Sequence, residues 1–163
     1  MKQIWAPWRK TYIQQGIGKS PKRECVFCRI KKSKNKHDHL VIKKTLHSFA
    51  LLNLYPYTVG HALAIPSKHV RSLTELNQVE RLDLINLCCD LQEAIQKAYR
   101  PKGFNIGINL GTVGGAGLPK HVHIHVVPRW TGDSNFMSVL GDTRVISDTL
   151  ASSHQLLTKI IKK

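Results

Sequence analysis

The sequence predicts an α+β fold, with an antiparallel sheet and one long amphipathic helix. Three observations support this prediction: short apolar segments separated by turn residues, one long segment with helical spacing, and alternating segments that follow it. A chain of 163 residues with 42% hydrophobic composition has enough apolar side chains for one domain with a core. It is too short for two full domains joined by a linker.

The first two strands are expected at residues 47–54 and 61–66. The two segments, HSFALLNL and HALAIP, are apolar and contain strand-forming residues. Pro56 and Gly60 lie between them and favour a turn. We therefore expect the two strands to form a hairpin-like pair.

The long helix is expected over residues 76–98, where apolar residues recur at spacings of three and four. Asn77 followed by Glu80 is typical of a capping box at a helix N-terminus. Pro101 and Gly103 then end the helix. The predicted buried face comprises Leu76, Val79, Leu82, Ile85, Cys88 or Cys89, Leu91, Ile95 and Ala98.

Two further strands are expected at residues 104–110 and 121–127, separated by the glycine-rich loop 111–119. The last strand reads HVHIHVV, so its period of two alternates histidine with apolar residues. The apolar face packs on the core, and the imidazoles are expected to form a row on the surface of the sheet. This row comprises His121, His123 and His125.

A row of imidazoles suits two chemistries. It can bind a metal ion, or a neutral imidazole can act as a nucleophile on phosphorus while its neighbours transfer protons. The adjacent loop GTVGGAGLP favours the second, because glycines let backbone amides approach a phosphate closely.

The His121–His125 segment followed by Val-Val-Pro-Arg resembles the signature of the histidine triad family. Segments 48–53, 60–66 and 109–111 are similar to family elements in the family order. The opening WAPWR and the closing PRWTGDSNFM resemble a bacterial branch of diadenosine tetraphosphate phosphorylases and related dinucleoside polyphosphate hydrolases. The resemblance implies a histidine-triad-like fold, a homodimer, and a nucleotide or dinucleoside polyphosphate substrate.

The resemblance also implies roles for individual residues. His123 matches the nucleophile that forms a nucleotidyl-histidine intermediate, His125 matches the residue that assists the leaving group, and His61 supports the nucleophile. The matching substrate-binding residues are Asn53 at the ribose, and Asn109 with Gly115, Ala116, Gly117 and Leu118 at the phosphates. Gly117 departs from the family, in which hydrolases commonly carry Gln there and some phosphorylases Ser. The second-step acceptor, water or phosphate, therefore stays open.

A metal site is suggested by Cys25 and Cys28, although a cysteine pair alone is only suggestive and two buried free thiols are the alternative. The resemblance adds His69 and His121 as partners, which implies a structural zinc site and no catalytic cofactor. Cys88 and Cys89 are interpreted as core residues of the long helix.

Trp130 lies five residues beyond His125 and has two interpretations. It is either a core residue or a wall of the substrate site, and we assign it to the site because it leaves the catalytic strand at the active-site end. Stacking on a second base would be its function there.

The ends of the chain suggest the remaining expectations. Residues 1–24 are expected to form a basic, aromatic arm, and residues 25–163 a single domain with a C-terminal extension. The first 44 residues hold 13 basic and 2 acidic groups within a chain of net charge +15, which leaves nucleic-acid binding as an alternative function. No apolar run is long enough to cross a membrane, and no secretory leader is visible, so a cytoplasmic location is expected.

Overall fold

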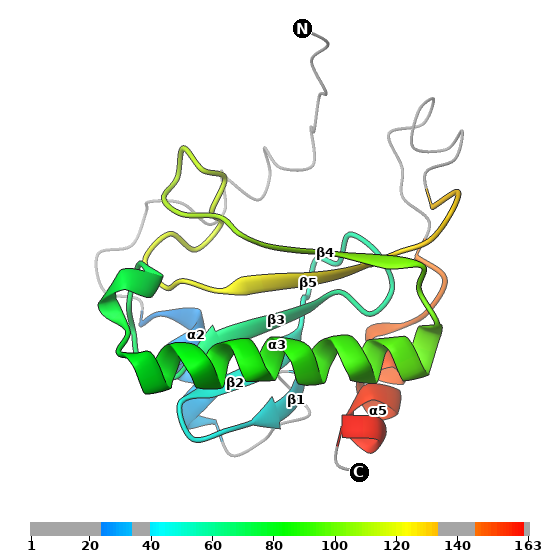
Figure 1. Ribbon diagram of the computed structural model, residues 1–163, viewed down its shortest axis with the longest axis horizontal. Coiled ribbons are helices and arrows are strands. Elements are labelled where there is room, and N and C mark those ends of the chain that lie inside the picture. The colour runs from blue at the N-terminus through cyan, green and yellow to red at the C-terminus, as the bar shows by residue number, and fades with distance from the viewer. Residues whose placement is uncertain (1–23, 34–39, 134–145, 162–163) are drawn as a thin grey trace, which may run out of the picture.

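The computed structural model describes residues 24–33, 40–133 and 146–161. The expected arm at residues 1–24 lies outside the described residues except for Glu24, and the structure describes only residues 24–33 and 40–44 of the 44-residue basic region on which the nucleic-acid alternative depends. The described residues form an α+β fold with a five-stranded antiparallel sheet, so the predicted fold class is confirmed (Figure 1).

The sheet has the strand order β1-β2-β3-β5-β4. Every neighbouring pair is antiparallel, and β5 is paired on both sides. The central position of β5 fixes His125, which lies opposite Leu63 of β3 on one side and opposite Gly107 of β4 on the other. The strands are β1 (Val41–Lys44), β2 (Ser48–Leu52), β3 (Ala62–Pro66), β4 (Gly103–Ile108) and β5 (Ile124–Arg129).

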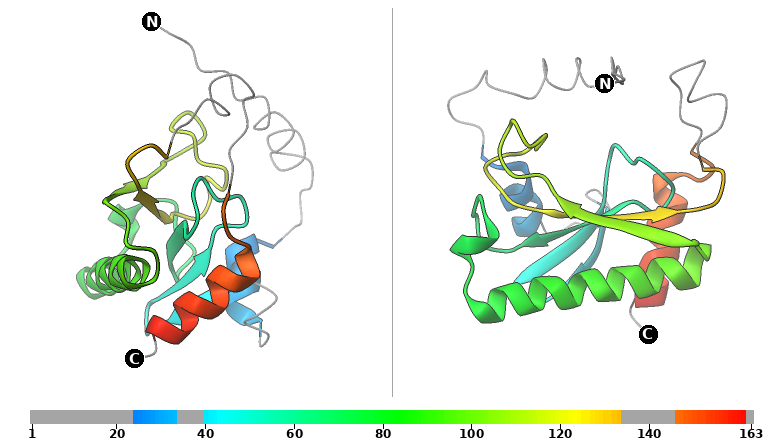
Figure 2. Two further views of the ribbon diagram at one scale, coloured as in Figure 1. Left: turned by 90° about the vertical axis from the view of Figure 1, so that its right-hand side faces the viewer. Right: turned by 45° about the horizontal axis from the view of Figure 1, so that its top comes forward.

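Helices cover both faces of the sheet. The long helix α3 (Gln78–Tyr99) and the C-terminal helix α5 (Leu150–Ile161) pack on one face, where they share one apolar core with the strands. The short helix α2 (Val26–Lys32) packs on the other face with a second, smaller core. In the left view of Figure 2 the strands lie between α3 and α2. Among the described helices, none has the length and hydropathy that crossing a membrane requires.

Helix α3 confirms the predicted boundaries but not the whole predicted face. Asn77 caps the helix and forms a reciprocal capping box with Glu80. Val79, Leu82 and Ile85 were expected in the core, yet they are 61%, 60% and 49% exposed. The residues that α3 actually buries are Leu84, Leu87, Cys88, Leu91, Ala94 and Ile95.

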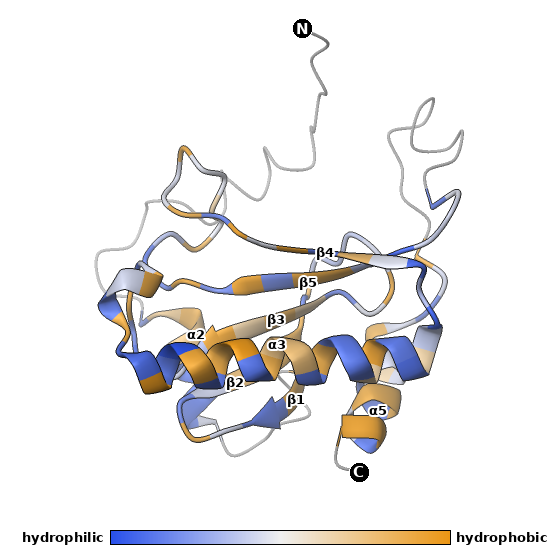
Figure 3. Ribbon diagram, in the orientation of Figure 1, coloured by the Kyte–Doolittle hydropathy of each residue, from blue (hydrophilic) through white to orange (hydrophobic). Residues whose placement is uncertain are grey.

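The reason for this error is that α3 carries apolar residues on two sides. Apolar positions recur along the whole helix in Figure 3, and only one side faces the sheet. The two adjacent cysteines of α3 also lie on different sides of the helix. Cys88 is buried, as expected, whereas Cys89 is exposed, so its assignment to the core is wrong.

A ring on α3 connects the hairpin turn to the C-terminal helix. Gly60, in the turn between β2 and β3, has a φ of +75°, and a Cβ there would lie 3.1 Å from the Tyr99 ring. Both the left-handed backbone and the close approach require glycine. The Tyr99 hydroxyl lies 3.1 Å from Asp148 Oδ2 and 2.8 Å from Ser153 Oγ. Tyr99 is therefore in contact with the turn on one side and with the α5 region on the other.

Candidate functional site

Three histidines, His61, His123 and His125, meet at one end of β5, and we call them the imidazole cluster. His125 lies inside β5, His123 immediately precedes that strand, and His61 follows the Gly60 turn directly before β3. The ring centroid of His125 is 5.2 Å from that of His61 and 5.0 Å from that of His123. The antiparallel pairing of β3 with β5 brings these distant positions together.

The imidazoles are not the exposed row that the alternation predicts. His61 has 0% exposure, His121 1% and His123 6%, while His125 is half-buried. Strand β5 begins only at Ile124, so His121 and His123 lie in the segment that leads into it. The expected apolar face is confirmed, because Val122, Ile124 and Val126 all belong to the core beneath α3.

Hydrogen bonds with the backbone determine which nitrogen of His61 carries a proton. The backbone N–H of Tyr57 lies 3.1 Å from His61 Nδ1, which must therefore accept. The proton of neutral His61 then resides on Nε2, which lies 3.0 Å from His125 Nδ1 and donates to it. His125 consequently carries its own proton on Nε2, the nitrogen turned away from His61.

His123 has the opposite arrangement. Its Nδ1 lies 3.0 Å from the carbonyl oxygen of His121 and can only donate to it. The Nε2 of neutral His123 therefore bears a free lone pair. Two residues of one strand segment thus offer different groups: His123 offers a nucleophilic nitrogen and His125 offers an N–H.

Burial keeps the imidazole cluster uncharged. Burial, followed by the neighbouring imidazoles, lowers the pKa of His61 to about 3. The same causes lower the pKa of His125 to about 4, and burial lowers the pKa of His123. All three rings are neutral at pH 7, which is the form that a nucleophilic imidazole requires.

The two asparagines predicted to bind substrate flank the imidazole cluster. The backbone N–H of Asn53 donates to the carbonyl of His61 at 2.9 Å, and the side-chain Nδ2 lies 3.4 Å from His61 Nδ1. Asn109 follows Ile108, which pairs with Ile124 at the start of β5. The sheet therefore places Asn109 beside the start of β5, next to His123, and Asn53 beside His61.

The glycine-rich loop is folded back on itself. The backbone amide of Gly115 donates to Thr112 at 3.0 Å, and that of Ala116 donates to Gly111 at 3.1 Å. A Cβ on Gly114 would lie 2.2 Å from the Leu110 carbonyl oxygen, so this tight turn requires glycine. Ala116 is also buried. The amides of Gly115 and Ala116 are therefore already used inside the loop.

The structure places Trp130 beside α3. Its indole N–H donates to the carbonyl oxygen of Tyr99, at a distance of 3.3 Å, where α3 ends. Trp130 is half-buried in this position. This contact favours a packing role, whereas the assignment to the substrate site stays a prediction.

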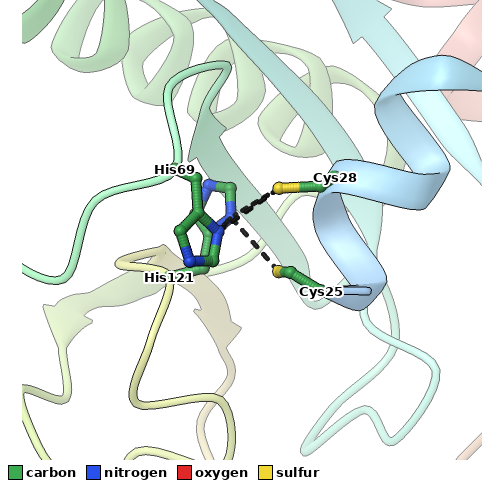
Figure 4. Close-up of side chains that lie close together, drawn as sticks. All are labelled: Cys25, Cys28, His69 and His121. Carbon is green, nitrogen blue, oxygen red and sulfur yellow. Dashed lines mark hydrogen bonds between the residues drawn. The ribbon is translucent and has the colours of Figure 1, made fainter. Parts of the chain in front are cut away.

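The other four predicted residues, Cys25, Cys28, His69 and His121, form a second cluster, which we call the Cys/His cluster. One potential ligand atom from each residue lies within 4.8 Å of all the others. Figure 4 shows the two sulfur atoms directed from α2 and the residue before it toward the imidazoles of His69 and His121. The structure thus brings together all four predicted ligands.

Four of the six distances between potential ligand atoms in the Cys/His cluster fit tetrahedral coordination of a metal ion. The His69 and His121 Nδ1 atoms are 3.2 Å apart, and Cys25 Sγ and Cys28 Sγ lie 3.4 and 3.8 Å from His121 Nδ1. Ligands bound tetrahedrally to zinc at about 2.0–2.3 Å are separated by about 3.3–3.8 Å. His121 Nε2 donates to the Pro66 carbonyl at 2.9 Å, which leaves Nδ1 unprotonated toward the cluster. The residues therefore form a possible metal site.

Two residues of the site were missed by the sequence analysis. The ring of Phe27, which lies between the two cysteines, contacts His121 and His123 edge-on with centroids 5.4 and 5.2 Å apart. Tyr57 supplies the amide that bonds His61, and its ring lies parallel to that of His125. The position of Phe27 within the C-x-x-C segment was a usable signal, but nothing in the sequence pointed to Tyr57.

Comparisons with known proteins find relatives by sequence and by fold. The HIT domain model matches residues 33–132. A Mycobacterium tuberculosis protein named AP-4-A phosphorylase is 34% identical over 162 residues, which cover 96% of this chain and 83% of that protein. A Schizosaccharomyces pombe protein named bis(5'-nucleosyl)-tetraphosphatase (asymmetrical) is 38% identical over 93 residues, 57% of this chain and 50% of that protein.

A solved structure shares the fold. The crystal structure of a Zn-bound histidine triad family protein from Mycobacterium smegmatis superimposes with a TM-score of 0.70 and 26% identity, covering 85% of this chain and 94% of that one. The domain match spans more than half of the chain, and the phosphorylase relative is similar along nearly all of it. This protein therefore belongs to the histidine triad family.

Proposed function

We propose that the protein is a nucleotide hydrolase or phosphorylase that cleaves the phosphoanhydride of a dinucleoside polyphosphate, such as diadenosine tetraphosphate, through a covalent intermediate on His123. The observation that carries this proposal is a pair of contacts, from the His121 carbonyl to His123 Nδ1 and from His61 Nε2 to His125 Nδ1, which imply opposite tautomers at His123 and His125. The names of the phosphorylase and tetraphosphatase relatives support the same substrate class.

In the first step, Nε2 of His123 attacks the α-phosphorus. A phosphorus–nitrogen bond forms, the bond to the bridging oxygen breaks, and the polyphosphate leaves with the proton from His125 Nε2. In the second step, water or inorganic phosphate attacks the same phosphorus and gives up a proton to His125 Nε2, which restores the starting form of that ring. The phosphorus–nitrogen bond then breaks and the electron pair returns to His123 Nε2.

Substrate contacts belong to the same proposal. Asn53 and Asn109 flank the imidazole cluster, so we assign them to the ribose and the phosphates. The amides of Gly115 and Ala116 donate inside the loop, so in this conformation Gly117 and Leu118 are the segment's remaining candidates for phosphate contact.

We assign the Cys/His cluster to zinc. Two thiolates and two imidazoles form a common donor set for structural zinc, and all four positions are protein ligands. Bound zinc would supply cross-linking rather than Lewis-acid chemistry. It would join Cys25 and Cys28 at α2 to His121, the residue whose carbonyl orients His123.

A homodimer is also part of the proposal. Val79, Leu82 and Ile85 expose apolar surface on α3, and Ile106 on the edge strand β4 is 47% exposed. Exposed apolar groups of this kind mark interaction surfaces. Sedimentation of wild type against Leu82→Glu tests it: we expect the variant to be monomeric and equally folded, whereas a monomeric wild type would contradict the proposal.

Product analysis with diadenosine tetraphosphate tests the activity. AMP and ATP formed without inorganic phosphate would indicate hydrolysis. ADP and ATP formed only with phosphate would indicate phosphorolysis, because the phosphate adds to the nucleotidyl group on His123. Absence of turnover under both conditions would reject the proposed function.

A further inference from the structure

We propose that Tyr57 is a positioning residue that sets the direction of the hydrogen bond between His61 and His125. This inference rests on the proposed function, because it assigns to Tyr57 the control of the group that protonates the leaving oxygen. Tyr57 would act through two separate parts, its backbone N–H and its ring.

The backbone N–H of Tyr57 acts on His61. Neutral His61 has two nitrogens, and either could carry the proton. The Tyr57 amide, 3.1 Å from Nδ1, can only donate and so places that proton on Nε2. If the tautomer were reversed, two N–H groups would face each other at Nδ1, and His61 could no longer donate to His125.

The ring of Tyr57 acts on His125. The two rings are nearly parallel, with an interplanar angle of 14° and centroids 6.0 Å apart. The Tyr57 ring also lies 4.6 Å from the centroid of His61. A flat ring beside both imidazoles limits their rotation and keeps His125 Nδ1 aligned with His61 Nε2, at 3.0 Å.

Hydrogen bonds fix the loop that contains Tyr57 to β5 and to the residue that precedes β3. The Thr58 hydroxyl donates to the Pro128 carbonyl of β5 at 3.0 Å, and the His61 amide donates to the Thr58 carbonyl at 3.2 Å. The chain between β2 and β3 therefore links the Tyr57 amide to the strand that carries His125.

Three substitutions separate the two parts of Tyr57. Tyr57→Phe keeps the amide and the ring, Tyr57→Ala keeps the amide, and Tyr57→Pro removes both. We expect the single-turnover rate of Tyr57→Phe with diadenosine tetraphosphate to stay within about twofold of the wild-type rate. The same rate should fall about tenfold in Tyr57→Ala and about a hundredfold in Tyr57→Pro.

A second substrate distinguishes positioning from mere folding. A 2,4-dinitrophenyl ester of a nucleotide releases a phenol that is much more acidic than the terminal phosphate of ATP, so its cleavage does not need His125 as an acid. We expect its rate to change less than about threefold in Tyr57→Ala and Tyr57→Pro. Equal losses for both substrates would overturn the proposal.

Thr58→Val is the matched control. It removes the bond to Pro128 and loosens the same loop, but it keeps the amide and the ring of Tyr57. We expect a lower melting temperature and an unchanged ratio between the two substrates. A ratio that shifts as much as in Tyr57→Ala would show that loop rigidity, not Tyr57, sets the effect.

Imidazole nitrogen NMR provides a measurement that does not depend on activity. We expect wild type to hold His61 as the Nε2–H tautomer, and Tyr57→Pro to show a mixture of tautomers. An unchanged His61 tautomer in folded Tyr57→Pro would overturn the assignment of the amide, and if that variant does not fold, the Tyr57→Ala substrate ratio decides. If wild type shows the expected tautomer but cleaves neither substrate, the proposed function fails while the hydrogen-bond assignment stands.

Discussion

The Cys/His cluster and the imidazole cluster contain histidines of one short segment that present different nitrogens. In the first, the Pro66 carbonyl binds Nε2 of His121, so Nδ1 faces two sulfur atoms. In the second, the His121 carbonyl binds Nδ1 of His123, so Nε2 is the free nitrogen. The difference shows that the role of each imidazole depends on which nitrogen the backbone occupies and on what faces the other nitrogen.

The strongest test of this comparison uses two variants, one expected to lose turnover and the other expected to lose zinc. We expect His123→Ala to lower the turnover of diadenosine tetraphosphate more than about a thousandfold, because the nucleophile is removed, while zinc content stays unchanged. His121→Ala should have the reverse effect, with zinc lost and turnover reduced much less, because residue 121 keeps its backbone carbonyl. Turnover and metal content are measured on the same preparations. His123→Ala with a tenth of wild-type turnover would contradict the covalent mechanism.

Removing one sulfur tests the Cys/His cluster alone. We expect purified wild type to hold about one zinc ion per chain, and Cys28→Ser to hold almost none. Loss of the cross-link should lower the melting temperature by about 10 °C, since a few kcal/mol correspond to a shift of that size in a chain of this length. Cys89→Ser is the control, because Cys89 is exposed on α3, and it should change neither quantity. Wild type that binds no added zinc would reject the site.

Acid should destabilise the imidazole cluster over a defined range of pH. His61 and His125 have pKa values of about 3 and 4 in the folded protein, below the ordinary value of 6.5. Between pH 6.5 and 4 the unfolded chain therefore binds protons that the folded chain does not, and stability falls as the pH falls. We expect His61→Asn to reduce this slope by at most about 1.4 kcal/mol per pH unit, measured by urea unfolding. Parallel slopes in the two proteins would contradict this prediction.

The smallest expected effect concerns Trp130. Its bond to Tyr99 places it near the end of α3, so we expect Trp130→Ala to lower the melting temperature by a few degrees. The loss of kcat/KM should be equal for diadenosine tetraphosphate and for a p-nitrophenyl nucleotide. A selective loss for the dinucleotide would instead support stacking of Trp130 on a second base, which is worth about 1–3 kcal/mol.

Local signals predicted much of the fold. The limits of α3 follow from Asn77 and Glu80 at its start and Pro101 after its end, all within a few residues of the helix. The buried side of α3 could not be predicted from the local sequence. Leu82 and Leu84 are equally apolar, and only the position of the sheet decides which of them is buried. Strand β1 has only four residues and ends in two lysines, so its pattern is too short to detect.

The sequence predicted the reactive side chains of the site but not the backbone groups that orient them. Side chains with specific chemistry, such as Cys25 and His121, are visible in a sequence, and the family resemblance connected them. The role of the Tyr57 amide was not visible, because every residue except proline has such a group and only the folded loop directs it at His61. Burial of His123 was missed because alternation predicts the face of a strand but not the helix that covers it.

The contact of Tyr99 with Gly60 has a consequence for the boundary of the domain. Asp148 and Ser153, which hold the Tyr99 hydroxyl, lie beyond the segment that carries the histidines. A chain truncated after residue 133 would keep every proposed catalytic group but would lose the anchor of the ring that supports the Gly60 turn. His61 would then follow a turn without its support, so we expect activity to require the C-terminal helix.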